Sequence, residues 1–221
     1  MPHYFAGFHK INHKAKSASG CTCFQWVSVD FHNYAVKMGG IRLYCEGLSA
    51  NMGDIELVFP TKFHEASVSE YLREHIDFGE NSLHGDSFLD EAESYDEWLM
   101  NINKALHGEI PSVIFFAVRK IDGKMLGTIN VRHPYEGYVQ LHGHIGYGVR
   151  PSERGKGYAT AMLKLALDYC KDIGLDKVLL TCDKSNIASA KTITKCFGVF
   201  ESESPQSDGR ILQRYWISIS N

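Results

Sequence analysis

Hydrophobic positions recur from residue 54 onward with periods that predict a regular series of strands and helices. Residues 54–59 form a mostly apolar run that predicts a strand. Val68, Tyr71, Leu72 and Ile76 then recur at helical spacing, which predicts a first helix. The pattern therefore predicts a folded domain that begins near residue 54.

A second helix is predicted to begin at Ser94. The Ser94 hydroxyl can cap it while the Glu97 side chain reaches back, which completes a capping box. Gly108 is expected to end this helix. The side chains expected on its buried stripe are Tyr95, Trp98, Leu99, Ile102 and Leu106.

The next segment predicts a β-hairpin. Two apolar runs, 113–120 and 125–131, flank a turn that contains Asp-Gly. That dipeptide favours positive φ at both central turn positions and is a strong short-range hairpin signal.

The rest of the chain alternates between strand and helix patterns. Its continuous apolar run at 177–182 is typical of a strand buried on both faces. We predict strands at 141–150, 177–182, 199–201 and 211–219 and helices at 156–173 and 187–195. The whole order predicts one mixed α/β domain over residues 54–221.

Residues 1–53 differ from this domain and are expected to be a poorly defined N-terminal extension. They carry five basic and two acidic side chains, whereas the remaining 168 residues carry 18 basic and 24 acidic ones. The pair Cys21-x-Cys23 and four histidines raise the idea of a metal site. No second ligand pair follows at a recognisable zinc spacing, so we expect no metal.

Composition narrows the class of protein. The 221 residues are 44% hydrophobic and carry a formal net charge of −3, which excludes disorder as the main state and argues against nucleic acid as a partner. The chain has no apolar run long enough to span a membrane. The six cysteines lack any Cys-x-x-Cys pair, and the amino terminus lacks the apolar core of a secretory signal. We therefore expect free thiols in a cytoplasmic protein.

The segment 154–159 gives the most specific indication of a ligand-binding site in the sequence. It runs Arg-Gly-Lys-Gly-Tyr-Ala, between a predicted strand and a predicted helix. Glycines allow backbone N–H groups to converge and to approach a ligand closely, and the helix start adds unsatisfied donors and partial positive charge. Such a turn suits a phosphate or pyrophosphate.

Two common phosphate motifs do not fit this segment. A Walker A loop has Lys followed by Ser or Thr after its last glycine, whereas Lys156 precedes Gly157. A dinucleotide fingerprint has three glycines, and the run that begins at Gly146 lacks the third.

The turn resembles that of the GNAT superfamily of acyl-CoA-dependent N-acetyltransferases. The family pattern is Arg or Gln, two residues, Gly, one residue, then Gly or Ala, and Arg154, Gly157 and Ala159 match it. Asn186, followed by a predicted short helix, matches a second family element. The resemblance covers residues 54–221, and within the superfamily the chain looks like an uncharacterised bacterial subgroup of predicted acetyltransferases.

The resemblance implies a mostly antiparallel sheet with a splayed strand pair and flanking helices. It implies acetyl-CoA as co-substrate, with the pyrophosphate on the turn and pantetheine between the splayed strands, beside the main chain of Gly148 and Val149 and the Asn186 side chain. An ordinary helix cap is the alternative role for Asn186, and the two roles can coexist. The cofactor-binding residues that it implies are Gly148, Val149, Arg154, Gly155, Lys156, Gly157, Tyr158, Ala159, Asn186 and Ser189.

The reaction needs a group that removes a proton from the amine. His144 and His142 are the first candidates, because superfamily members use histidines on the equivalent strand, although this pair falls one residue out of step. Glu136 and Glu201 are weaker candidates. The tyrosine that many relatives use to protonate the leaving thiolate is replaced here by Ile193, with Tyr147 and Tyr158 as substitutes.

The acceptor is expected to be a primary amine, small or peptidic. The loop 79–93 carries five acidic side chains where the family lines its acceptor pocket, which favours a cationic amine, and a solvated acidic loop is the alternative. A non-catalytic acyl-CoA-binding module is the rival function, and an anion-binding structural protein is a third. The sequence also leaves a homodimer open.

Overall fold

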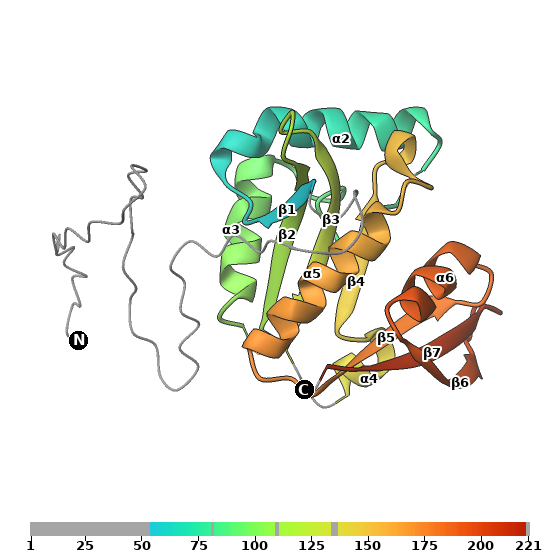
Figure 1. The fold of residues 1–221 in the computed structure, drawn as a ribbon. Helices are drawn as coiled ribbons and strands as arrows, with labels where there is room; N and C mark the ends of the chain where they lie inside the picture. Colours follow the sequence, from blue (N-terminus) through green and yellow to red (C-terminus); the bar gives the residue numbers. More distant parts are fainter. Residues whose placement is uncertain (1–53, 81, 109–110, 134–136, 220–221) are drawn as a thin grey trace, which may run out of the picture. The chain divides into compact units, whose positions relative to one another are not determined.

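The computed structural model describes residues 54–80, 82–108, 111–133 and 137–219, which form two antiparallel sheets (Figure 1). The first sheet has the order β1-β2-β3-β4, with β1 at Ile55–Val58, β2 at Ser112–Arg119, β3 at Met125–Arg132 and β4 at Ile145–Val149. The second has the order β5-β7-β6, with β5 at Lys177–Asp183, β6 at Val199–Pro205 and β7 at Ile211–Ser218.

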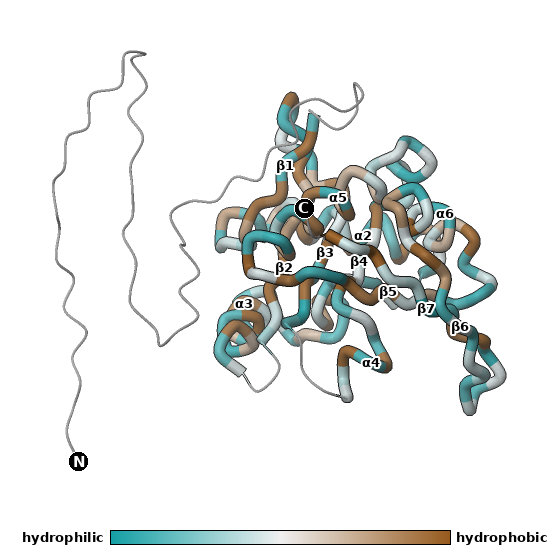
Figure 2. Tube along the Cα trace, turned by 60° about the horizontal axis from the view of Figure 1, so that its bottom comes forward, coloured by the Kyte–Doolittle hydropathy of each residue, from teal (hydrophilic) through white to brown (hydrophobic). Residues whose placement is uncertain are grey.

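Helices cover both faces of the first sheet. The described helices are η1 (Lys62–His64), α2 (Glu65–Asp77), α3 (Tyr95–Ala105), α4 (Tyr138–His142), η2 (Pro151–Glu153), α5 (Tyr158–Asp172) and α6 (Ile187–Lys195), of which α4 and α6 pack against β5 of the second sheet. The Trp98 ring of α3 stacks on Phe116, with ring centroids 5.7 Å apart, and Tyr169 of α5 meets Phe115 edge-on at 5.2 Å. Neighbouring residues of a strand point to opposite faces, so α3 and α5 lie on opposite sides of the sheet (Figure 2).

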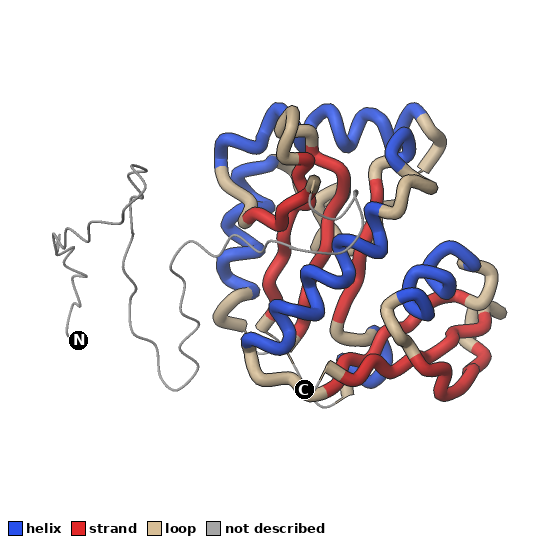
Figure 3. Tube along the Cα trace, in the orientation of Figure 1, coloured by secondary structure: helices blue, strands red, loops and turns tan. Residues whose placement is uncertain are grey.

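Strands β4 and β5 start close together and then diverge. The His144 N–H donates to the Leu179 carbonyl at 2.7 Å, and the Thr181 hydroxyl donates to the His142 carbonyl at 3.2 Å. Beyond these contacts the two strands belong to separate sheets, and Figure 3 shows the strands running apart toward α6. The mixed fold with a splayed strand pair, expected from the family resemblance, is confirmed.

Several local predictions are also confirmed. The hairpin forms between β2 and β3, although only Gly123 of its turn adopts positive φ. Ser94 caps α3 by accepting the Glu97 N–H at 3.2 Å, while the Glu97 carboxylate bonds the Glu93 N–H rather than that of the cap. The capping-box prediction is therefore right about the cap residue and wrong about the return bond.

Two predictions are wrong in detail. The strand expected at 141–150 begins only at Ile145, because α4 runs to His142 and Gly143, at φ +73°, turns the chain before the strand. In α2 the side chain of His75 is buried and that of Ile76 is exposed. The buried His75 ring packs on the Tyr71 ring, with centroids 4.5 Å apart, and its Nδ1 lies 2.8 Å from the Glu80 carboxylate, contacts that periodicity in the sequence does not predict.

Three cysteines fall within the described residues, Cys170, Cys182 and Cys196, and all three are free thiols, as expected. No helix among the described residues is long and apolar enough to cross a membrane. The N-terminal extension predicted for residues 1–53, with its two-cysteine motif, lies outside the described residues.

Phe197 ends α6 in a conformation that favours glycine. Its φ is +64°, and the next N–H, that of Gly198, returns to the Ile193 carbonyl at 2.9 Å. This is the position where helices commonly place glycine, since a side chain costs about 1–2 kcal/mol in the left-handed region. The Phe197 side chain is 82% exposed, so it gains little packing in return.

We expect Phe197→Gly to stabilise the protein by about 0.5–1 kcal/mol, after subtraction of the entropy cost of glycine in the unfolded chain. Urea unfolding measures this free energy. Phe78→Gly is the matched control, because Phe78 also ends a helix and is exposed but has a φ of −85°. The control should lose stability, and a loss in both variants would contradict the strain at Phe197.

Candidate functional site

The turn predicted to bind phosphate is exposed and has the geometry of an anion site. Between η2 and α5, Gly155 and Gly157 adopt φ values of +74° and +89°. Gly157 is the N-cap of α5, and no side chain caps that end of the helix. The N–H groups of the first turn, from Tyr158 on, therefore have no acceptor within the helix. A Cβ at either glycine would meet no protein atom within 4 Å, so the space over the turn is open.

The Arg154 side chain positions this turn. Its two terminal nitrogens contact the two Glu80 carboxylate oxygens at 2.5 and 2.7 Å, and its Nε donates to the Val149 carbonyl at 2.9 Å. The sequence predicted Arg154 as a cofactor residue that supplies positive charge. In the structure that charge is paired with Glu80, so the guanidinium acts on the end of β4 and the loop after α2.

Glu80 is held in its ionised form. The Arg154 hydrogen bond is the main cause and lowers the pKa of Glu80 to about 2, against partial burial, with a further contribution from His75. The His75 ring lies 2.8 Å from the carboxylate through Nδ1. Glu80 is therefore not part of the acidic field that the sequence placed at the acceptor.

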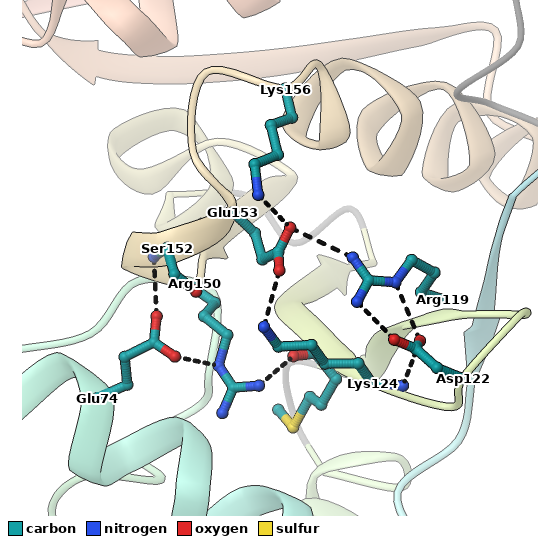
Figure 4. A network of polar contacts seen from close by, with 9 residues as sticks. Glu74, Arg119, Asp122, Lys124, Arg150, Ser152, Glu153 and Lys156 are labelled. Carbon is teal, nitrogen blue, oxygen red and sulfur yellow. Dashed lines mark hydrogen bonds and ion pairs between the residues drawn. The ribbon is translucent and has the colours of Figure 1, made fainter.

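Glu153 connects the other side of the turn to the β2–β3 hairpin (Figure 4). Its buried carboxylate accepts from Lys124 at 2.7 Å and from Lys156 at 2.9 Å, and Arg119 lies at 3.4 Å. Burial alone would raise the pKa of Glu153. The hydrogen bonds and charges of the two lysines outweigh burial and lower this pKa to about 2. Lys156 of the predicted cofactor set therefore pairs with Glu153 across the turn.

Helix α2 fixes η2 through Glu74. One carboxylate oxygen accepts the Ser152 N–H at 2.8 Å, and the other lies 2.8 Å from Arg150 Nε (Figure 4). Arg150 is buried and also donates to the Met125 carbonyl at 3.2 Å. The segment before the glycine turn is thus held on both sides.

Backbone groups of β4 face the gap to β5 at alternate residues. The Arg150 N–H donates to Leu126 and the Arg132 N–H donates to the carbonyl of His144, so even-numbered residues of β4 bond β3. The polar groups of Gly148 thus belong to the ladder with β3, whereas the Val149 N–H faces the gap. Of the two residues predicted to bond pantetheine through the main chain, Val149 has the better placed donor.

On the far side of the gap, Asn186 caps α6. Its side-chain oxygen accepts the Ser189 N–H at 3.0 Å, which is the capping role that the sequence left open beside binding. The Asn186 residue is exposed, and its amide nitrogen is the end available to a ligand. Tyr147 reaches across from β4, and its hydroxyl lies 3.5 Å from the Ser189 carbonyl. Burial raises the pKa of Tyr147 to about 12.

The two histidines predicted as bases are not together on one strand. His142 ends α4, and His144 precedes β4 with its ring buried. His144 Nδ1 accepts the Leu179 N–H at 2.9 Å, and burial lowers the His144 pKa. A proton could enter at Nδ1 only after this contact breaks. Of the weaker candidates, Glu201 pairs with Arg214 at 2.7 Å, and Glu136 lies outside the described residues.

A cavity of about 480 Å³ lies on the α2–α3 side of the sheet, under the loop 82–91. Asn130 and Arg132 of β3 and Tyr138 of α4 also line it. The loop packs tightly on β4, because a Cβ at Gly148 would lie 2.5 Å from the His84 carbonyl oxygen. No residue of β4 lines the cavity, and the loop that lines it is the part that packs on β4.

The acidic loop predicted at the acceptor contributes three carboxylates to this cavity, those of Asp86, Asp90 and Glu91. Asp86 is buried, and burial together with the neighbouring Asp90 raises the pKa of Asp86 to about 6. Asp86 also accepts the Leu89 N–H at 2.8 Å, and Asp90 accepts that of Leu83 at 2.9 Å. These two acids therefore shape the loop as well as the cavity.

Sequence reasoning did not single out His84, Asn130 or Arg132, which also line the cavity. Arg132 ends an apolar strand and could have been noticed as a charge at the sheet edge. His84 and Asn130 carry no such signal, since only the packing of the loop on β3 and β4 brings them into the cavity.

The family model for the acetyltransferase (GNAT) family matches residues 73–199, and the chain belongs to this family. Its fold is similar to that of the ribosomal-protein α-N-acetyltransferase RimL in complex with coenzyme A, with 14% identity, a TM-score of 0.62 and coverage of 80% of this chain and 98% of that one. The fold is also similar to that of the microcin C7 self-immunity acetyltransferase MccE in complex with acetyl-CoA and AMP, with 16% identity, a TM-score of 0.57 and coverage of 75% of this chain and 92% of that one.

A spermidine N-acetyltransferase from Vibrio cholerae, described as dodecameric, gives 17% identity and a TM-score of 0.55, with coverage of 75% of this chain and 94% of that one. No curated protein matches the sequence. At these identities the structural likenesses show the fold, and the family match carries the class of protein.

The buried Glu153 carboxylate predicts a pH-dependent stability. A folded-state pKa near 2, below the ordinary value of about 4.3, means stability that is present at neutral pH and lost as the pH falls from about 4 to 2. We expect Glu153→Gln to lower the free energy of unfolding by about 2 kcal/mol at pH 7, with the difference vanishing near pH 2.

Urea unfolding at pH 7 and pH 3 measures the Glu153 effect. Glu203→Gln is the control, because Glu203 makes comparable contacts to Lys184 and Gln213 at an exposed site, where its loss should cost much less stability. Equal losses in the two variants, or a constant loss across pH, would show that burial does not set the energetics of Glu153.

His144 gives a sharper test, because asparagine can replace Nδ1 as the acceptor of the Leu179 N–H but cannot take a proton. We expect His144→Asn to keep turnover and stability, and His144→Ala to lose about 1–2 kcal/mol of stability. Acetyl transfer and thermal unfolding are measured on both variants. A folded Asn variant that loses activity a hundredfold would establish His144 as the base.

Proposed function

We propose that the protein transfers an acetyl group from acetyl-CoA to a primary amine. The observation that carries the proposal is the uncapped start of α5, with two left-handed glycines, at the open end of the gap between β4 and β5. The residues fit coenzyme A, since the turn offers converged N–H donors and open space, and the gap offers the Val149 N–H and the Asn186 amide.

Residues 155–159 would hold the diphosphate mainly through backbone donors, because the Arg154 and Lys156 charges are engaged by Glu80 and Glu153. Acetyl-CoA supplies the thioester whose acetyl group is transferred. The chain supports the transfer by orienting the pantetheine along β4 and by admitting the amine from the cavity under loop 82–91. RimL, MccE and the spermidine enzyme are acetyltransferases by name, which supports this reading.

The amine must lose a proton before it attacks the thioester. His144 and His142 stay predictions for this role, and the described contacts of His144 count against it. Tyr147, whose hydroxyl projects from β4 toward α6, is the better placed of the two tyrosines proposed to assist the leaving thiolate, because Tyr158 lies at the start of α5.

We expect Gly157→Ala to weaken coenzyme A binding at least about tenfold, because a methyl group would enter the open space over the turn and strain a φ of +89°. Isothermal calorimetry with coenzyme A measures the affinity. Gly209→Ala is the matched control, since Gly209 has a φ of +83° and equally open surroundings in the β6–β7 turn.

The control should lose similar stability without losing affinity. Unchanged coenzyme A binding in a folded Gly157→Ala protein would overturn the cofactor site. Thiol release from acetyl-CoA over a panel of amines separates the enzyme from the rival binding module, which would bind the cofactor and turn over none of them.

A further inference from the structure

We propose that Arg132 binds a carboxylate of the acceptor, so that the protein acetylates amines that also carry an acid group. This inference rests on the proposed function and names the substrate class of the same site. Its basis is the placement of one guanidinium, without a carboxylate partner among the described residues, in a cavity that acidic side chains also line.

Arg132 is the last residue of β3, and its guanidinium lies against the start of β4. One terminal nitrogen donates to the Gly143 carbonyl at 3.3 Å, and the guanidinium carbon lies 5.9 Å from the centre of the Tyr138 ring. A Cβ at Gly146 would lie 3.4 Å from the other terminal nitrogen. These contacts orient the group without neutralising it.

Three arginines near the glycine turn, by contrast, are paired with carboxylates. Arg119 pairs with Asp122, Arg150 with Glu74 and Arg154 with Glu80, whereas no described carboxylate lies within 4.0 Å of Arg132. Burial lowers the pKa of Arg132, as expected for a cation that has lost part of its water. A half-buried charge without a partner is unfavourable, and an anionic ligand would remove that cost.

The acidic loop that lines the cavity suits the ammonium end of such an acceptor. Asp86, Asp90 and Glu91 supply the negative charge there, on the loop that packs against β4. Between the two ends, Asn130 bonds the Gly146 N–H at 3.0 Å and the Ser87 hydroxyl at 3.3 Å. A charge of each sign across one small cavity favours a zwitterion over a simple polyamine.

The loop is held in one position, as a selective wall requires. Ser87 and Phe88 both adopt left-handed backbone, with φ of +55° and +62°, a costly conformation for residues with side chains. The Trp98 indole N–H bonds the Asp86 and Ser87 carbonyls at 3.0 and 3.1 Å. The cavity volume of about 480 Å³ suits an amino acid or the end of a short chain.

The test uses the full chain, acetyl-CoA and acceptors in matched pairs: glycine, β-alanine and γ-aminobutyrate against their carboxamides. The measured quantity is the ratio of kcat/KM for each acid to that for its amide. For at least one pair we expect a ratio of about ten or more in the wild type, because a charge-assisted bidentate contact is lost with the amide.

Arg132→Gln should bring this ratio to about one, and Arg132→Lys should keep part of it. Arg210→Gln is the control, because Arg210 pairs with Asp208 in the exposed β6–β7 turn and should leave the ratio unchanged. Coenzyme A affinity, measured by calorimetry, verifies that each variant is folded.

Equal use of acids and amides by the wild type would overturn the inference without any variant, and leave the acetyltransferase assignment standing. A preference that survives in folded Arg132→Gln would also overturn the role of Arg132. Coenzyme A binding without thiol release on any acceptor would instead overturn the proposed function.

Discussion

Ion pairs from three separate segments hold the start of α5, and the site depends on them. Glu74 and Glu80, at the end of α2 and just after it, bond the segment 150–154, while Glu153 joins that segment to the β2–β3 hairpin. Since these contacts fix the backbone before Gly155, the glycine turn can keep its left-handed geometry and its donors can stay converged. Binding then requires little reorganisation of the protein.

The same pairs decide how an anion would be held. Arg154 and Lys156 are the cations nearest the turn, and both are engaged by carboxylates of the chain. The turn therefore offers oriented N–H dipoles rather than free side-chain charge. Backbone donors at a helix start suit a diphosphate in a defined pose, which matters where the thioester must then lie at one place along β4.

The sequence predicted most of the fold because its signals are local. The hairpin, the Ser94 cap and the glycine turn each depend on a few neighbouring residues. The candidate site was less predictable because its partners are distant in sequence. The sequence predicts that Arg154 binds phosphate, whereas in the structure Arg154 pairs with Glu80, which lies 74 residues earlier in the chain.

The role of His144 is hard to judge from the sequence for a related reason. An imidazole near the start of a strand has the chemistry of a base, and only the approach of Leu179 shows that its Nδ1 serves the contact between β4 and β5. Arg132 shows the reverse case. A charge at a strand end looks like ordinary surface, and only the fold places it in a cavity without a carboxylate beside it.

That cavity bears on the choice between an enzyme and a module that only binds acyl-CoA. A binding module would need the glycine turn and the gap between β4 and β5, which lie toward α5 and α6. It would gain nothing from a second cavity on the α3 side of the first sheet, shaped by a strained loop and lined by charges of both signs. Strain and half-buried charge cost stability, and they are retained where a second ligand makes use of them. The second ligand required by acetyl transfer is the acceptor, and the loop that lines the cavity packs on β4, the strand along which the acetyl donor would run.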